Sequence, residues 1–435
     1  MRIYPYKIGL FFLIFTLPLE VVSYYAGFTI KLWMLIFAAG IFFWLIQIIR
    51  GKTVIQVNPV IFLFVLLLMA NMVSLLNVGD VGRWLRMTIQ YIILFSLTLY
   101  VINTVNTERK IEFSVRSLIV TGIVLGIYGL IQWIGAAYGY DLSLPIEKYP
   151  LYGPDMNSSL RLWTVQIGDI WVPRSRGTFG DPTIYGGYML SIAPLIISVT
   201  VYNICKKKYV FVSLIATVIV VGATFGSFSR SIIGGFILST LVILFYWKRI
   251  FNKVSILKKL FIIVIFLLIA FFILPSKISN LFNPSLYMGR VGQTFLKGDE
   301  STSHHKNLAL EAVRIWKEHP VFGVGLGNYG VFVGEGAPAN AMSHSAFLSF
   351  LSETGLVGCI INAFMVLYLV IITHKYLIKS PSRDIFFAYR VGLLAGYIGV
   401  IGSNFTYHYY NQPFLWFMIG IIILLNKHAN LTGSI

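Results

Sequence analysis

The sequence predicts an all-α, polytopic membrane protein with about twelve transmembrane helices. Of the 435 residues, 57% are hydrophobic and only 11% are charged, whereas roughly a quarter of the residues in a soluble domain are charged. The mean hydropathy is +0.80. Apolar runs long enough to cross a hydrocarbon core of roughly 30 Å recur along the chain. We therefore expect residues 1–435 to form a single integral membrane domain.

Twelve apolar segments have the length and composition of membrane-spanning helices. They are approximately 8–28, 32–49, 59–76, 87–102, 117–136, 183–204, 209–228, 231–247, 260–275, 355–373, 385–404 and 412–425. Alternate connections are short and basic, and because Lys and Arg collect in cytoplasmic loops, both termini are expected to be cytoplasmic. This topology also accounts for much of the net charge of +18, so we expect no nucleic-acid partner.

Two long connections fall on the opposite, outer face, at about 137–182 and 276–354. Long loops with motifs of their own are where function usually resides. We therefore expect the active site on the outer face of the cytoplasmic membrane, with its catalytic motif in the second loop.

Arg230 interrupts a long apolar stretch. Between Tyr209 and Trp247 it is the single charge in 39 residues, which as one helix would be roughly 58 Å long, about twice the hydrocarbon thickness. The stretch must therefore fold back, with Arg230 at or near an outer turn. The alternative is an interfacial arginine that snorkels to the headgroups.

The first long loop ends in "RSRGTFGDP", residues 174–182. Asp181 is suited to cap the helix that begins at Pro182. Arg174 and Arg176 lie just before this helix N-terminus, where the macrodipole favours an anion, and a planar guanidinium can bind phosphate through two hydrogen bonds. Solvated loop arginines are the alternative.

The second long loop carries an amphipathic helix. Leu308, Ala312, Ile315 and Trp316 recur at helical spacing before Pro320, which predicts a helix at the membrane interface. The following "GVGLGNYG" lacks the Lys-Ser/Thr of a nucleotide-binding loop, so we expect a packing role for it.

His344 is the candidate base. It precedes a helix that begins near Ser345, and with an ordinary pKa of about 6.5 it is mostly neutral at pH 7 and can accept a proton. A hydrogen-bonded capping role is the alternative. A zinc site formed by His304, His305, His344 and Glu335 would match no known spacing, and we expect no metal.

Four motifs together resemble the bacterial O-antigen ligase and O-antigen polymerase family. They are "RGTFGDP" before a helix, "SFSRS" between two helices, "HPVFGVGLGNYG" after the amphipathic helix, and "HSAFLSFLSETGLVG". The resemblance covers most of the chain in motif order. It implies a membrane glycosyltransferase that takes a glycan from undecaprenyl diphosphate, needs no cofactor, and passes the glycan to an acceptor sugar hydroxyl.

The resemblance also implies roles for individual residues. Arg176 and Arg230 would bind the diphosphate and His344 would be the catalytic base, with Arg174, Asp181 and Glu353 in support. Many family members carry an Arg at the start of the amphipathic helix, where this chain has "STSHHKN". Arg290 or Arg314 would then supply the third cation. Because the diphosphate is a good leaving group, we expect an inverting transfer that requires no general acid.

Two alternatives stay open. Within the family, the protein could be a surface-polysaccharide polymerase, which we favour, or a ligase that uses a lipid A-core acceptor. Chain-length regulators or flippases would be partners in either case. A flippase for the lipid-linked glycan is the alternative from another class, and it should have charged or broken helices at mid-membrane depth. Glu20 and Arg390 are the few candidates for such charges.

Overall fold

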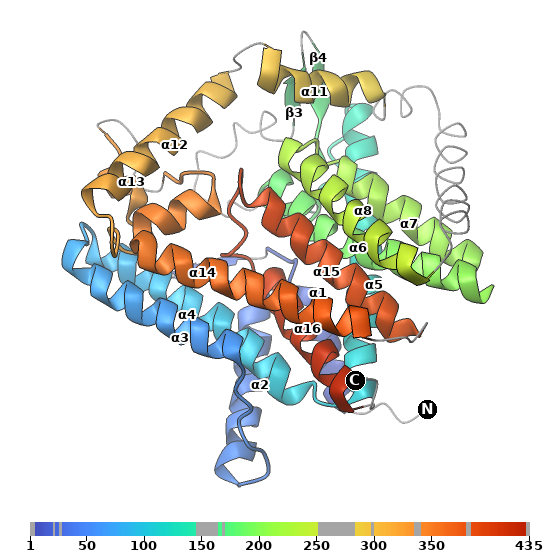
Figure 1. Ribbon diagram of the computed structural model, residues 1–435. Helices are drawn as coiled ribbons and strands as arrows, with labels where there is room; N and C mark the ends of the chain where they lie inside the picture. The colour runs from blue at the N-terminus through green and yellow to red at the C-terminus, as the bar shows by residue number, and fades with distance from the viewer. Residues whose placement is uncertain are drawn as a thin grey trace.

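The computed structural model describes residues 5–20, 22–25, 28–144, 164–167, 170–250, 283–296, 300–334, 341–379 and 384–431. Figure 1 shows an assembly of long helices. These are α1 (Pro5–Thr16), α2 (Leu32–Ile49), α3 (Pro59–Val73), α4 (Val81–Thr104), α5 (Glu108–Ala137), α6 (Pro182–Lys206), α7 (Val210–Phe225), α8 (Arg230–Ile250), α11 (Pro284–Leu296), α12 (Glu300–Glu318), α13 (Tyr329–Phe332), α14 (Ala346–Lys379), α15 (Ile385–Ser403) and α16 (Pro413–Leu431), with a 3-10 turn at Ser74–Asn77. The described strands form two antiparallel hairpins, β1 (Val22–Tyr25) with β2 (Phe28–Lys31), and β3 (Thr164–Ile167) with β4 (Ile170–Pro173).

The predicted class, an all-α polytopic membrane protein, is confirmed at this level. Among the described residues, eight helices are long and apolar enough to cross a membrane, and three shorter apolar helices, Lys7–Thr16, Val210–Phe225 and Pro413–His428, coincide with further predicted spans. The predicted span 260–275 lies outside the described residues. A total of twelve spans therefore stays a prediction.

The first predicted span, 8–28, is wrong in its second half. Helix α1 ends at Thr16, and the chain then turns into the β1–β2 hairpin. Pro18 removes a backbone donor and disfavours a helical residue before it. Beyond it, the buried Glu20 side chain accepts a hydrogen bond from Lys31. This pair bridges the hairpin strands to the segment that leaves α1.

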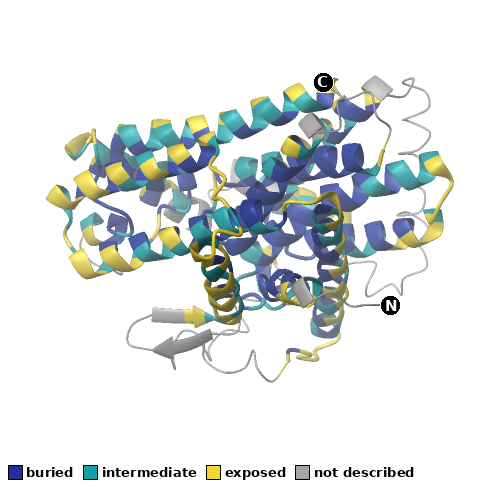
Figure 2. Cartoon of the chain, turned by 90° about the horizontal axis from the view of Figure 1, so that it is seen from below, coloured by how far each residue is buried: buried dark blue, intermediate teal, exposed yellow. Residues whose placement is uncertain are grey.

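Helices α6 and α15 form the centre of the molecule. In both helices, 83% of the most apolar 18-residue stretch is buried, whereas in α2 the buried share is 17%. Helix α15 packs against α6 and α8, and the buried residues gather at the centre in Figure 2. On α2, Phe42 and Phe43 are 60% and 64% exposed. Such surfaces are expected to face lipid rather than water.

The helices α4, α6, α8, α14 and α16 begin at a common end of the molecule, here called the site end. Side-chain bonds join these starting points: Tyr409, before α16, donates to the Thr183 carbonyl in the first turn of α6, and Ser403, at the end of α15, donates to the Ser231 carbonyl in α8. The same helices finish at the opposite end, here called the basic end. Lys206, Lys379 and Lys427 lie in or near their last turns.

Helix α14 is broken near the site end, at Gly355. This residue has φ +65° and ψ −168°, so the next two amides cannot bond within the helix. They donate instead to the loop after α12: Leu356 N to the Pro320 carbonyl at 2.9 Å and Val357 N to the Val321 carbonyl at 3.2 Å. The carbonyls of the "HPVFG" motif thus accept from the amides that the break in the "SETGLVG" motif leaves without helical partners. One set of hydrogen bonds pairs the backbone groups of both motifs.

The break predicts the effect of Gly355→Ala. A Cβ at this position would lie 2.2 Å from the Val321 carbonyl oxygen, at a φ that disfavours L side chains. We expect a loss of at least about 2 kcal/mol of stability, seen as a thermal midpoint lower by several degrees in detergent. Gly234→Ala is the matched control, because a Cβ there meets nothing within 4 Å. Equal melting of the two variants would contradict the role of the break.

Candidate active site

The first loop is fastened to the turn between α7 and α8. Ser175 N donates to the Gly226 carbonyl at 2.7 Å, and Arg174 Nε donates to the neighbouring Ser227 carbonyl at 2.7 Å. The indole of Trp133, in α5, donates to the Pro173 carbonyl. The motif "RSRGTFGDP" therefore lies directly against "SFSRS", although about fifty residues separate them in the sequence.

This contact brings Arg174 and Arg230 together. Burial lowers the pKa of the Arg174 guanidinium; Asp181, Tyr407 and Tyr409 oppose this, and the charge of Arg230 lowers the pKa further. Arg174 Nη2 also donates to Thr183 Oγ1 at 3.2 Å, in the first turn of α6. Arg230 is the first residue of α8 and is half-buried. Two cations thus share one neighbourhood beside two helix N-termini.

Arg176 has a different environment. Its side chain is 5% exposed, and Nη1 donates to the Phe179 carbonyl three residues further along the loop. The same loop is held by Gln132, which donates to the Gly177 carbonyl, and by Glu20 Oε2, which accepts from Gly180 N at 2.8 Å. Arg176 therefore lies in the interior of the loop, two residues from Arg174.

Asp181 caps α6 as predicted, with its side chain accepting from Thr183 N and Ile184 N. It is also the leading favourable charge beside Arg174. The cap therefore has two effects: it begins the helix, and it offsets part of the repulsion between the arginines.

His344 stands immediately before α14, in a left-handed backbone conformation with φ +55°. The segment is held by Ala346 N, which donates to the carbonyls of Asn404 and Tyr407. The half-buried His344 ring lies edge-on to His305, with 4.5 Å between the ring centroids. Its centroid is 6.4 Å from that of Tyr407.

The 404–412 loop joins these parts. Tyr407 neighbours the His344 ring on one side and contributes to the electrostatic surroundings of Arg174 on the other. Tyr409, 5.0 Å from Tyr407 between ring centroids, donates to the first turn of α6. The arrangement runs from His305 through His344 and the two tyrosines to Arg174 and Arg230. It can offer cations, aromatic faces and a proton acceptor.

Sequence reasoning missed Tyr407 and Tyr409, and it considered His305 beside His344 only as a zinc ligand. The signal for the tyrosines was present as "FTYHYY", six residues between two spans of which five are aromatic or histidine. Aromatic side chains are frequent where sugars or interfaces are bound, because they combine an apolar face with a polar tip. No comparable signal existed for His305, since its neighbour His344 is 39 residues away in the sequence.

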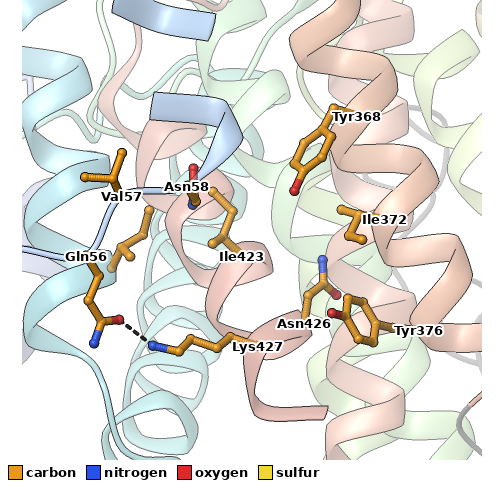
Figure 3. Close-up of a pocket in the computed structure, with 10 residues that line it drawn as sticks. Gln56, Val57, Asn58, Tyr368, Ile372, Tyr376, Ile423, Asn426 and Lys427 are labelled. Carbon is orange, nitrogen blue, oxygen red and sulfur yellow. Dashed lines mark hydrogen bonds between the residues drawn. The ribbon is translucent and has the colours of Figure 1, made fainter. Parts of the chain in front are cut away.

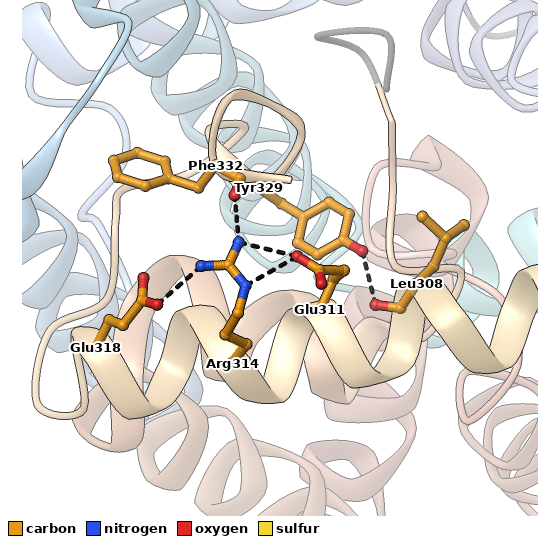
Figure 4. A network of polar contacts seen from close by, with 6 residues as sticks. All are labelled: Leu308, Glu311, Arg314, Glu318, Tyr329 and Phe332. Atoms are coloured by element: carbon orange, nitrogen blue, oxygen red, sulfur yellow. Dashed lines mark hydrogen bonds and ion pairs between the residues drawn. The ribbon is translucent and has the colours of Figure 1, made fainter. Parts of the chain in front are cut away.

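Arg314 lies away from this group, on the outer surface of α12. Its guanidinium donates to Glu311, Glu318 and the Phe332 carbonyl (Figure 4), with ion-pair distances of 2.8 Å to both carboxylates. All of these partners belong to α12 and α13.

Arg290 belongs to α11, and its side chain lies outside the described residues. Three residues before it, the ring of Tyr287 stacks on Phe228 at 4.4 Å between centroids. Helix α11 therefore crosses the same α7–α8 turn that carries Arg230.

The amphipathic helix buries its apolar stripe in the protein. Leu308, Ala312 and Ile315 form a cluster with Val324 and Tyr329 from the following loop. The Tyr329 hydroxyl donates to the Leu308 carbonyl at 2.6 Å (Figure 4). The stripe is thus accounted for by contacts within the chain.

Glu353 binds the "GVGLGNYG" loop through both its side chain and its backbone. Its buried carboxylate accepts from Tyr329 N, and its backbone carbonyl accepts from Gly325 N at 2.7 Å. Gly323, Gly325 and Gly327 all have positive φ, and a Cβ on any of them would approach a neighbour to within 2.6 Å. The glycines allow the loop to pack closely against α4 and α14, in agreement with the packing role expected from its sequence.

Glu20 and Arg390, the two charges considered for a transporter, both have structural partners. Glu20 binds Lys31 and the first loop. Arg390, in α15, is buried and Nε donates to the Leu425 carbonyl of α16 at 3.0 Å.

These features define a multi-pass membrane protein with a cationic, histidine-bearing site formed by loops at one end of its helices. Residues 215–363 match a family model described as O-Antigen ligase. The match spans 149 of the 435 residues and supports the resemblance to the O-antigen ligase and polymerase family seen in the motifs. Three of the four motifs fall within the match, and "RGTFGDP" precedes it. A search of curated proteins found no match.

The 404–412 loop also predicts how stability depends on pH. Burial lowers the pKa of His408 to about 4, and its Nε2 lies 3.0 Å from the Tyr91 hydroxyl. The unfolded chain, with a pKa near 6.5, takes up this proton first as pH falls. Stability should therefore decrease from about pH 6.5 towards 4, by about 1.4 kcal/mol per unit.

The measurement compares wild type with His408→Gln by thermal unfolding between pH 7.5 and 5. We expect the variant to lose less of its midpoint over this range, whatever its midpoint at pH 7.5. Parallel curves would show that His408 is not buried in its neutral form.

Proposed function

We propose that this protein is a membrane glycosyltransferase that transfers a glycan from undecaprenyl diphosphate to a sugar hydroxyl. The observation that carries the proposal is the meeting of Arg174 and Arg230 at the N-termini of α6 and α8. The family match over 215–363 supports the reaction class.

The paired arginines favour a diphosphate over a single charge. Each cation raises the electrostatic potential at the other, and Arg230 begins a helix whose N-terminus is already positive. A bound dianion would relieve this repulsion. Guanidinium forks suit the bidentate geometry of phosphate oxygens. During transfer, negative charge grows on the departing diphosphate, so the same cations would stabilise the transition state more than the ground state.

His344 is the proposed base. The acceptor hydroxyl oxygen forms a bond to the anomeric carbon of the donor glycan, while the bond from that carbon to the diphosphate oxygen breaks. The hydroxyl proton passes to neutral His344 and then to solvent, and the undecaprenyl diphosphate leaves with the electron pair. Attack opposite the leaving group inverts the anomeric centre. The step requires no metal and no oxidant.

The surrounding residues divide into direct and indirect roles. We propose that Arg174 and Arg230 contact the diphosphate, and that Arg176 shapes the loop, since it is buried and bonds the Phe179 carbonyl. His305 would orient the His344 ring. Arg290 stays a candidate for the third cation because α11 lies on the turn that carries Arg230. The Glu partners of Arg314 argue against a part for it.

We further propose that the site end faces the outside of the cytoplasmic membrane, with both termini in the cytoplasm. The basic residues at the opposite end support this orientation through the positive-inside tendency. Donor, acceptor and product would then be handled on the side where surface polysaccharide is assembled. Flippases and chain-length regulators would be the expected partners.

Polymerase activity is the favoured form, and reconstitution tests it. Purified protein in liposomes would be given an undecaprenyl-diphosphate oligosaccharide and no other substrate. A ladder of longer carrier-linked chains means polymerase, whereas product that forms only after lipid A-core is added means ligase. Movement of the donor across the bilayer without a new glycosidic bond would overturn the enzyme proposal.

In this assay, His344→Ala should lower the rate about 10²–10⁴-fold, the usual contribution of a positioned base. Expression and thermal midpoint should change little, because the ring is half-buried and at a loop–helix junction. His319→Gln, at the far end of the amphipathic helix, controls for the loss of a histidine elsewhere. Activity that survives in His344→Ala would rule out the base assignment.

The arginine assignment is tested by substitution with Gln. Arg174→Gln and Arg230→Gln should each lower the rate about 10²–10³-fold. Melting should change little in Arg230→Gln, whereas Arg174→Gln also loses the bond to the Ser227 carbonyl and should melt somewhat lower. Arg176→Gln should instead lower the thermal midpoint. Arg116→Gln is the control, since this arginine is 68% exposed and pairs with Glu112 in α5. If Arg176→Gln lost activity while its melting stayed normal, Arg176 would be a ligand and the assignment would be reversed.

A further inference from the structure

A cavity lies at the basic end, remote from the candidate active site. Its volume is about 450 Å³, and four segments line it: the approach to α3, the end of α4, the second half of α14 and the last turns of α16. Figure 3 shows α16 between the other elements, with Lys427 reaching across to Gln56. Helices α14 and α16 begin at the site end and finish at this cavity. From Gly355 to Tyr376, α14 rises roughly 32 Å.

The wall of the cavity contains polar atoms that have no hydrogen-bond partner among the residues that the structure describes. Asn426 is 4% exposed; its Nδ2 donates to Thr373 Oγ1 at 2.8 Å, and within the described part of the chain Oδ1 has no hydrogen-bond partner. Asn58 caps α3 through Oδ1, while its buried Nδ2 has no partner among the same residues. Each such atom is unfavourable unless a ligand or water satisfies it.

The position of these groups is fixed by the surrounding structure. Asn103, in α4, accepts from Gln56 N at 2.6 Å and donates to the Gln56 carbonyl at 3.3 Å. This pair holds the extended segment before α3 against α4 and directs the Gln56 side chain towards Lys427. The polar wall is therefore built, since the buried Asn426 and the cation Lys427 of α16 converge with the half-buried Asn58 that precedes α3.

The other half of the wall is apolar. Val57, Ile102, Ile372 and Ile423 line the cavity beside the polar groups. Asn58 Nδ2 requires an acceptor, Asn426 Oδ1 requires a donor, and Lys427 adds a positive charge at the mouth. A soluble anion would satisfy the cation and leave the apolar half uncovered, whereas a hydrocarbon alone would leave the amides unpaired.

We propose that this cavity binds an anionic phospholipid whose headgroup carries hydroxyls, the chemistry of phosphatidylglycerol. The phosphate lies at Lys427, an ester or phosphate oxygen accepts from Asn58, a glycerol hydroxyl donates to Asn426, and the acyl chain begins among the aliphatic residues. The basic end favours this choice because basic residues beside membrane spans attract anionic lipids.

Native mass spectrometry of the full, delipidated protein in detergent tests the proposal. Phosphatidylglycerol and phosphatidylcholine with identical acyl chains would be titrated separately, and phosphatidylglycerol should bind about tenfold more tightly. Lys427→Gln should remove most of this preference; the residue is exposed, so folding should not suffer. Asn426→Leu should weaken phosphatidylglycerol binding at an unchanged Lys427.

Lys379→Gln is the matched control. It removes the same charge from an exposed position in the last turn of α14 without lining the cavity. Equal binding of the two lipids, or an equal loss in Lys379→Gln, would overturn the proposal. Displacement of phosphatidylglycerol by millimolar inorganic phosphate would also overturn it, because the site would then recognise a soluble anion.

Discussion

The site depends on two bonds from the first loop to the turn between α7 and α8: Ser175 N to the Gly226 carbonyl and Arg174 Nε to the Ser227 carbonyl. Without them, the first loop would lose its attachment to the turn that leads to Arg230. Irregular backbone that is buried in the protein, as at Ser175, has no surrounding water to satisfy its polar groups and must be paired within the protein. Here the hydrogen bonds that pair the polar groups of the loop backbone also position the arginines.

The same constraint governs the second loop. The broken helix α14 leaves two amides without helical partners, and the chain after α12 supplies Pro320 and Val321 carbonyls to them. Asn71, Asn77 and Asn328 add side-chain bonds that connect this loop to the α3–α4 corner. His344 lies eleven residues before the break at Gly355, in the segment that bonds the 404–412 loop through Ala346. Hydrogen bonds between the loops at the site end therefore connect the segment of the proposed base with those of the proposed phosphate ligands.

Much of the membrane architecture could be predicted from the sequence, because a span needs only about 20 apolar residues and its signal is local. The loops could not be predicted in the same way. Arg174 and Arg176 are equivalent by composition, and they differ only in which carbonyls lie within reach after folding. The pairing of His305 with His344 likewise requires α12 to pack back over α14. Pro18 and Glu20 indicate in the sequence that α1 ends early, but a span assigned by counting apolar residues does not take such residues into account.

Local rules of backbone and charge are broken where the proposed chemistry lies. Among the described residues, four that are not glycine have positive φ. Lys207 and Tyr209 belong to the tight connection between α6 and α7, where left-handed residues are common. Phe228 and His344 instead precede the helices whose first turns form the site. A left-handed backbone there is unfavourable by roughly 1–3 kcal/mol, and Arg230 adds a cation at the positive end of α8. An anion at that turn, such as the proposed diphosphate, would offset the unfavourable placement of this charge.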